Sequence, residues 1–126
     1  MGDPLELYFR TYAAAFDAFD ADEIAAHFHC PCVLVNSEIS VPLTTPHAIV
    51  SNMRAVLSHH RAEGYSRAAV TDVVPRHQAR NLATVEVGWQ VFKADESLLW
   101  DWRVTYNLVD YEDRWQILVA TTHGPT

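Results

Sequence analysis

Two stretches in which apolar and polar residues alternate constrain the fold of this chain most strongly. They span residues 82–93 and 98–109. A period of two is that of a β-strand with one buried and one exposed face, which is typical of antiparallel sheets. The apolar rows are Val85, Val87, Trp89 and Val91 in the first stretch, and Trp100, Trp102, Val104, Tyr106 and Leu108 in the second. We therefore predict long strands whose sheet has two chemically different faces.

Helical spacing characterises the beginning of the chain. Pro4 suits the first position of a helix, and Asp3 with Glu6 has the spacing of a capping box. Large apolar residues then recur at intervals of three and four, as in one face of a helix: Leu5, Phe9, Tyr12, Phe16 and Phe19. The pattern predicts an amphipathic helix whose aromatic stripe packs on the sheet.

The remaining elements complete an α+β layout. Two further helices are expected, from Asp20 to about His29 and from Thr45 to Gly64. Extended segments are predicted at residues 30–43, 65–77 and 115–122. Helices that precede a run of long strands, without a repeat or a linker, predict a single α+β domain over residues 1–126.

The charge balance excludes several classes of partner. Sixteen acidic residues against nine basic ones give a net charge of −7. Nucleic acids and anionic membranes require clustered lysine and arginine, so neither is an expected partner. Apolar runs are shorter than the roughly 20 residues of a membrane-spanning helix. The neighbouring thiols of Cys30 and Cys32 are too close for a structural disulfide. We expect a cytoplasmic protein with reduced cysteines.

Two segments carry a resemblance to a known superfamily. TYAAAFDAFDADEIAAHF (residues 11–28) and RVTYNLVDYEDRWQILVATTHG (residues 103–124) resemble the opening helices and the final hairpin of the nuclear transport factor 2-like superfamily. Its SnoaL-like cyclases and ketosteroid isomerases share this order of elements. The resemblance implies a cone-shaped, curved antiparallel sheet wrapped around the N-terminal helices, a cystatin-like roll.

The resemblance also implies a homodimer formed through the outer face of the sheet. The polar rows of the two alternating strands would form that face: Thr84, Glu86, Gln90, Asp101, Arg103, Thr105 and Asn107. Limonene epoxide hydrolases of this fold use arginine and aspartate, but Asp101 and Arg103 lie opposite the aromatic row. We therefore expect Asp101 and Arg103 on the solvent or dimer face, as part of a surface cross-strand ion pair.

Inside the roll, the same resemblance implies an apolar pocket lined by aromatic side chains. The residues expected to contact a small hydrophobic molecule there are Phe9, Tyr12, Phe16, Asn36, Met53, Trp89, Trp102 and Tyr106. Aromatic rings of this kind suit a flat apolar ligand. The alternative is that the rings fill the core and leave no space for a ligand.

Catalytic residues are less evident than pocket residues. Tyr12 aligns with the tyrosine that ketosteroid isomerases use to donate a hydrogen bond to the enolate oxygen. Asn36 falls where those enzymes carry the proton-transferring carboxylate, and an amide cannot take up that proton. Thr105 falls near the position of their acid. His123, after the last strand, is a further candidate for a general base.

These departures favour a ligand-binding domain without a cofactor over isomerase chemistry. The alternative is a cofactor-independent enzyme acting on a hydrophobic carbonyl or polycyclic substrate, as an isomerase, cyclase, dehydratase or hydrolase. Sequence alone leaves the ligand and the reaction open.

Histidine and cysteine cluster in HFHCPC, residues 27–32. Two side chains of each kind raise the possibility of zinc or copper, but their spacing matches no usual zinc pattern. We expect a structural segment and no metal. His47, His59 and His60 lie in or beside the helix that begins near Thr45, and we expect them on the surface.

Overall fold

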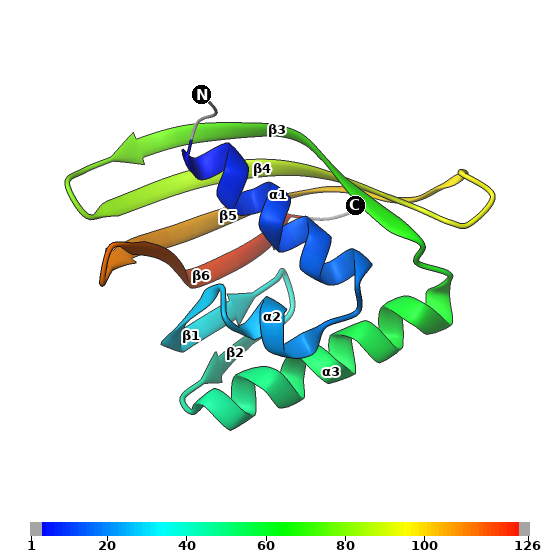
Figure 1. Ribbon diagram of the computed structural model, residues 1–126, viewed down its shortest axis with the longest axis horizontal. Helices are drawn as coiled ribbons and strands as arrows, with labels where there is room; N and C mark the ends of the chain where they lie inside the picture. The colour runs from blue at the N-terminus through cyan, green and yellow to red at the C-terminus, as the bar shows by residue number, and fades with distance from the viewer. Residues whose placement is uncertain (1–3, 124–126) are drawn as a thin grey trace.

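The computed structural model describes residues 4–123, and it shows helices lying against one curved sheet (Figure 1). The helices are α1 (Pro4–Asp17), α2 (Ala21–Ala25) and α3 (Pro46–Glu63). The strands are β1 (Phe28–Val35), β2 (Ser40–Leu43), β3 (Arg67–Gln78), β4 (Leu82–Phe92), β5 (Leu98–Tyr111) and β6 (Arg114–His123). The α+β order expected from the sequence is confirmed, and the extended segment 30–43 is divided between β1 and β2.

Local signals explain where the helices begin and end. The Thr45 hydroxyl accepts a hydrogen bond from the backbone N–H of Ala48, and Gly64 ends α3 in the left-handed conformation with a φ of 99°. Asp20 caps α2 in the same manner. The expected cap Asp3 lies outside the described residues. The prediction that Phe19 continues the stripe of α1 is wrong, because the helix ends at Asp17 and Phe19 has a φ of 53°.

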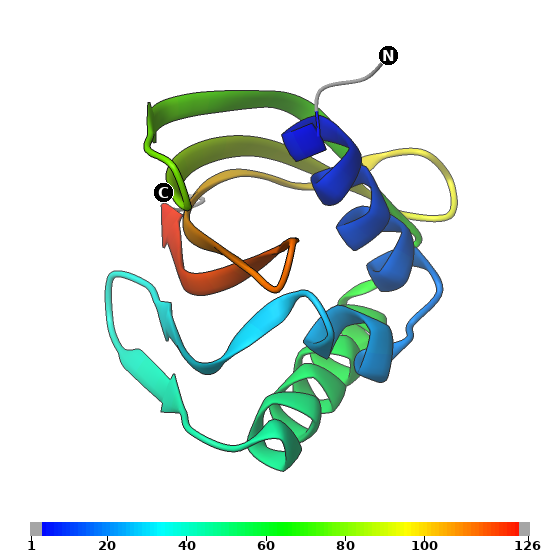
Figure 2. The ribbon, with the colours of Figure 1, turned by 60° about the vertical axis from the view of Figure 1, so that its left-hand side comes forward.

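The six strands form one sheet in the order β2-β1-β6-β5-β4-β3. Neighbouring strands are antiparallel except for β1 and β6, which pair in parallel. Figure 2 shows the sheet curving around one side of the molecule, while α1 and α3 lie along the other. The helices therefore cover the concave face of the sheet, where the buried row of the alternating strands lies.

The two faces of the sheet differ as the alternation predicts. On the concave face, Val85, Tyr106 and Ile117 are almost fully buried. On the convex face, Arg103 forms ion pairs with Glu86 on β4 and with Asp72 on β3, which confirms the expected cross-strand pairing of Arg103. Asp101, expected on the same face, forms no ion pair within the described residues. The absence of a side chain at Gly88 leaves room for the pair of Arg103 with Asp72, because a Cβ there would lie 2.8 Å from Arg103 Nη1 and 2.4 Å from Asp72 Oδ1.

Candidate functional site

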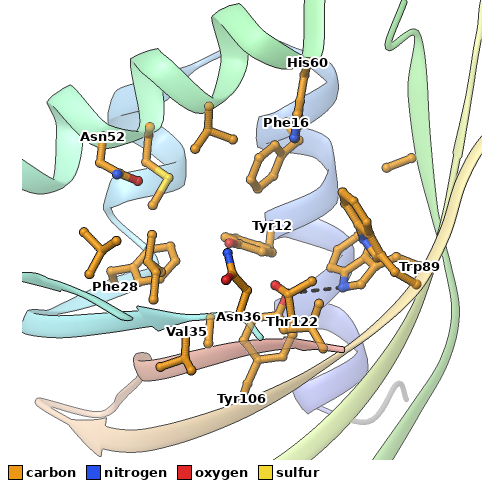
Figure 3. Close-up of a pocket in the computed structure, with 18 of the residues that line it drawn as sticks. Tyr12, Phe16, Phe28, Val35, Asn36, Asn52, His60, Trp89, Tyr106 and Thr122 are labelled. Atoms are coloured by element: carbon orange, nitrogen blue, oxygen red, sulfur yellow. Dashed lines mark hydrogen bonds between the residues drawn. The ribbon is translucent and has the colours of Figure 1, made fainter. Parts of the chain in front are cut away.

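A cavity of about 380 Å³ lies between the concave face of the sheet and helices α1 and α3 (Figure 3). This volume is within the range of about 300–1,000 Å³ that is usual for small-molecule sites. The strands of its wall contribute mostly apolar and aromatic side chains: Phe28, Leu34, Val35 and Val41 from β1 and β2, and Trp89, Val91, Trp102, Val104, Tyr106, Ala120 and Thr122 from β4, β5 and β6. The aromatic row of the alternating strands thus lines a space instead of filling it completely.

The two long helices form the opposite wall. Helix α1 contributes Tyr12 and Phe16, which are one turn apart. Helix α3 contributes Asn52, Met53, Val56 and His60. Their spacing of three to four residues places one face of α3 along the length of the cavity.

Of the residues expected to contact a ligand, Phe9 does not line the cavity. Its side chain has no exposed surface, and its ring centroid lies 4.7 Å from that of Tyr106 and 6.3 Å from that of Tyr12. Phe9 therefore packs behind the tyrosines, as a support for the cavity wall. The other expected residues all line the cavity.

The deep part of the cavity contains two tyrosine side chains whose rings are 6.1 Å apart. The indole N–H of Trp89 donates a hydrogen bond of 3.2 Å to the Tyr106 hydroxyl. Burial, followed by the neighbouring Tyr106, raises the pKa of Tyr12 well above its ordinary value of 10.0, and burial also raises the pKa of Tyr106. Both phenols are therefore neutral at pH 7.

Asn36 follows β1 at the turn into β2, and Figure 3 shows its side chain reaching into the cavity. Its Oδ1 accepts hydrogen bonds from the backbone N–H groups of Glu38 (2.8 Å) and Ile39 (3.0 Å). The amide oxygen thus holds the turn, as asparagine commonly does. The amide nitrogen remains as a donor, so this residue can orient a ligand oxygen but cannot remove a proton.

His60 is a cavity residue that sequence reasoning missed. The expectation that it lies on the surface is wrong, because the imidazole is half-buried and stacks on Tyr65 with a centroid distance of 5.3 Å and an interplanar angle of 8°. The ring centroid of Trp100 lies 5.0 Å from that of His60. Burial, followed by the charge of His59, lowers the pKa of His60 to about 4, so the ring is neutral at pH 7. The available signal was its position four residues after Val56.

Asn52 is the second missed residue, and it shares an unusual property with His60. Among residues 4–123, the buried side-chain polar atoms without a hydrogen-bond partner are Asn52 Oδ1 and His60 Nδ1. A buried polar atom left unpaired destabilises a protein by about 1–3 kcal/mol. Both of these residues belong to the wall of the same cavity.

His123, a candidate base, lies on the other side of the sheet. Its Nε2 is 2.7 Å from the Thr105 hydroxyl oxygen, and it pairs in register with Arg103 on the convex face. Its neighbour Thr122 points to the cavity instead. Alternation along β6 therefore separates His123 from the cavity-lining groups.

The side chains of HFHCPC have separate surroundings. His27 Nδ1 is 2.9 Å from the carbonyl oxygen of Glu23, and His29 Nδ1 is 3.0 Å from that of Pro31. Cys30 is exposed, whereas Cys32 is buried with a pKa raised to about 11 by burial. Within the described residues, no group of three or more His, Cys, Asp or Glu side chains is arranged to hold a metal ion.

The cavity wall that residues 4–123 form is uncharged. None of the described residues that line it is Asp, Glu, Lys or Arg. Hydrogen-bonding groups come from amides, hydroxyls, an indole and a neutral imidazole. Such a wall binds uncharged groups well, because an ion would lose its hydration without gaining a partner of opposite charge.

Helices laid across a strongly curved sheet, with an apolar cavity between them, define the class of cystatin-like rolls. The family described as "NTF2-like protein (DUF6841)" matches residues 3–125, so the chain belongs to that family. No protein with a curated description matched. Within residues 4–123, no helix is long and apolar enough to cross a membrane.

Solved structures agree on the fold. A protein of unknown function with a cystatin-like fold from Nostoc punctiforme aligns with a TM-score of 0.78, at 12% identity, over 97% of this chain and 90% of its own. A function-unknown protein from Mycobacterium tuberculosis aligns at 0.75, with 15% identity, over 94% and 68%. An NTF2-like protein from Novosphingobium aromaticivorans aligns at 0.74, with 10% identity, over 94% and 78%.

Proposed function

We propose that this protein binds an uncharged, largely apolar small molecule in the cavity between α1, α3 and the concave face of the sheet. The single observation that carries the proposal is the cavity of about 380 Å³, whose described lining contains aromatic and aliphatic side chains, a few neutral polar groups and no charged residue. Burial of apolar ligand surface against this wall would supply the affinity. The exposed, unbridged Cys30 supports a cytoplasmic setting.

Binding without a reaction is favoured over a cofactor-independent enzyme by the same lining. Proton abstraction from carbon requires a base whose pKa is close to the working pH. Asn36 is an amide, and His60, with a pKa lowered to about 4, is a weak base. Tyr12 and Tyr106 remain protonated, so they serve as hydrogen-bond donors for a ligand oxygen.

A neutral fluorescent probe, N-phenyl-1-naphthylamine, tests this function. We expect its fluorescence to rise on binding and the fluorescence of Trp89 and Trp102 to be quenched, because both indoles line the cavity. Ala68 also lines the cavity, so Ala68→Phe should fill part of it and raise the Kd at least about tenfold.

Ala69 provides the matched control for this experiment. It follows Ala68 on β3 and pairs with Gln90, whereas Ala68 pairs with the cavity residue Val91. Ala69→Phe therefore adds the same side chain to the opposite face and should leave probe binding unchanged. Circular dichroism confirms that each variant is folded. Absence of probe binding to the wild type, or equal binding by the two variants, would contradict the proposed function.

A further inference from the structure

Among residues 4–123, the buried side-chain polar atoms that lack a hydrogen-bond partner both belong to one wall of the cavity. Within the described residues, the side chains of Asn52 and His60 have no hydrogen-bond partner, and each buries one polar atom. Rotation of a terminal amide presents either its oxygen or its nitrogen to the cavity. A neutral imidazole likewise offers one donor and one acceptor. Both residues can therefore bind a hydroxyl or a carbonyl group of a ligand.

These two residues lie at the two ends of the cavity-facing surface of α3. Eight residues separate them, which corresponds to about 12 Å along a helix that rises 1.5 Å per residue. Figure 3 shows Asn52 and His60 well apart on α3, with the cavity extending below both. Met53 and Val56 lie between them on the same face, so the centre of this wall is apolar.

The far wall complements this arrangement. Trp89, Trp102 and Tyr106 present aromatic surface opposite α3, and they suit a flat ring system. The imidazole of His60 packs against Tyr65 and Trp100, so the plane of the ring is set before a ligand arrives, while a half-turn of the ring within that plane exchanges the nitrogen that faces the cavity. Preorganisation of this kind lowers the entropic cost of binding.

We propose that the ligand is an elongated, uncharged molecule with an apolar body and a hydrogen-bonding group at each end, one bound by Asn52 and the other by His60. This inference rests on the proposed binding function and specifies the class of ligand. It also explains why two polar residues occur in an otherwise apolar wall: the ligand supplies the partners that the protein lacks.

Three rigid compounds of graded polarity test the inference: trans-stilbene, trans-4-hydroxystilbene and trans-4,4′-dihydroxystilbene. They share one apolar body and differ in the number of terminal hydroxyl groups. For the wild type we expect each hydroxyl to tighten binding about tenfold, because it pairs a polar group that is otherwise unsatisfied. Quenching of tryptophan fluorescence or calorimetry measures the three dissociation constants.

Variants of similar side-chain size test whether Asn52 and His60 each bind one terminal hydroxyl group of the ligand. Asn52→Leu and His60→Phe should each remove the advantage of one hydroxyl, and the double variant should bind stilbene at least as tightly as the dihydroxy compound. His59→Phe is the control, because His59 is exposed on the same helix and should change nothing. The ligand-free variants should melt at the same temperature as the wild type or higher, since each substitution removes an unpaired buried atom.

The outcomes separate the two proposals. If N-phenyl-1-naphthylamine and stilbene bind but the hydroxyls bring no advantage, the assignment of Asn52 and His60 is wrong and the binding function stands. The assignment is equally wrong if the double variant keeps the preference for the dihydroxy compound. If neither the dye nor any stilbene binds, the proposed function fails together with the inference. Lower melting temperatures for both single variants, with unchanged preference, would assign them a structural role.

Discussion

The concave and convex faces of the sheet are made from the same strands, yet their side chains differ: the concave face is apolar and lines a cavity, and the convex face is polar and charged. The concave face packs aromatic rings around a cavity and leaves polar atoms of α3 unpaired beside it. The convex face carries an ion-pair network, in which Arg103 bridges Glu86 and Asp72, and Arg76 also contacts Glu86. The comparison shows that the ion-pair network of the convex face is satisfied within the protein, whereas among residues 4–123 the buried side-chain polar atoms that lack a partner lie beside the cavity.

The largest expected difference between the faces is in stability. Leu108 and Asn107 are neighbours on β5 that point to opposite faces, and Leu108 is 1% exposed. Leu108→Ala should lower the free energy of unfolding by about 2–5 kcal/mol, because it leaves a hole in a packed core. Asn107→Ala, which removes one hydrogen bond to Thr84, should cost about 0.5–1.5 kcal/mol. Urea denaturation measures both, and equal losses would contradict the distinction between the faces.

The convex face also carries our proposal for self-association. We propose a homodimer in which two such faces pack together, supported by the mixed polar surface of Thr84, Thr105, Asn107 and Thr121, which suits a hydrated interface. Thr121 lies on β6 within this face, so Thr121→Arg should weaken the dimer about tenfold or more by burying an unpaired charge.

Light scattering over a range of concentrations measures the dimer. Thr11→Arg, on the exposed side of α1, introduces the same charge away from the sheet and should leave association unchanged. A wild type that remains monomeric at all concentrations would rule out the dimer.

The smallest expected effect concerns the charge network itself. In Gly88→Ala, the new methyl group would meet the side chains of Thr71, Asp72 and Arg103 at 2.3, 2.4 and 2.8 Å, so these side chains must move and the pair of Asp72 with Arg103 must separate. An exposed ion pair contributes about 0–1 kcal/mol, and stability should fall by no more than that. Added salt should then affect the melting temperature less in the variant than in the wild type. An unchanged salt dependence would show that the pair contributes nothing.

Much of the concave face could be predicted from the sequence because strand alternation fixes which side chains share a face. Alternation groups Trp89, Trp102 and Tyr106 on one face, the resemblance implies that this face lines a pocket, and the three residues do line the cavity. The same rule applied to β6 assigns His123 to the convex face, once Thr122 is known to face the cavity. Depth within a stripe is harder to predict: Phe9 and Tyr12 follow one helical face, but only Tyr12 reaches the cavity.

The α3 residues could not be predicted from periodicity alone. A polar side chain in an amphipathic helix is usually exposed, so Asn52 and His60 carried the signature of surface residues. Their true surroundings depend on the curvature of the sheet, which brings β4 and β5 opposite α3. Asn36 differs from these two residues, because the resemblance did point to it as a site residue. The structure shows that it also has a structural role, since its side chain stabilises the turn between β1 and β2.

The parallel pairing of β1 with β6 has a consequence for how the protein folds. Strands β3 to β6 each pair with a sequence neighbour, so they can associate through short loops. Pairing of β1 with β6 joins Leu34 to Ala120 and closes a loop of most of the chain, which is entropically costly and slow. Both of these residues line the cavity. The cavity therefore comes into existence only with this long-range contact, and a molecule that binds there as proposed would stabilise the contact by its own binding free energy.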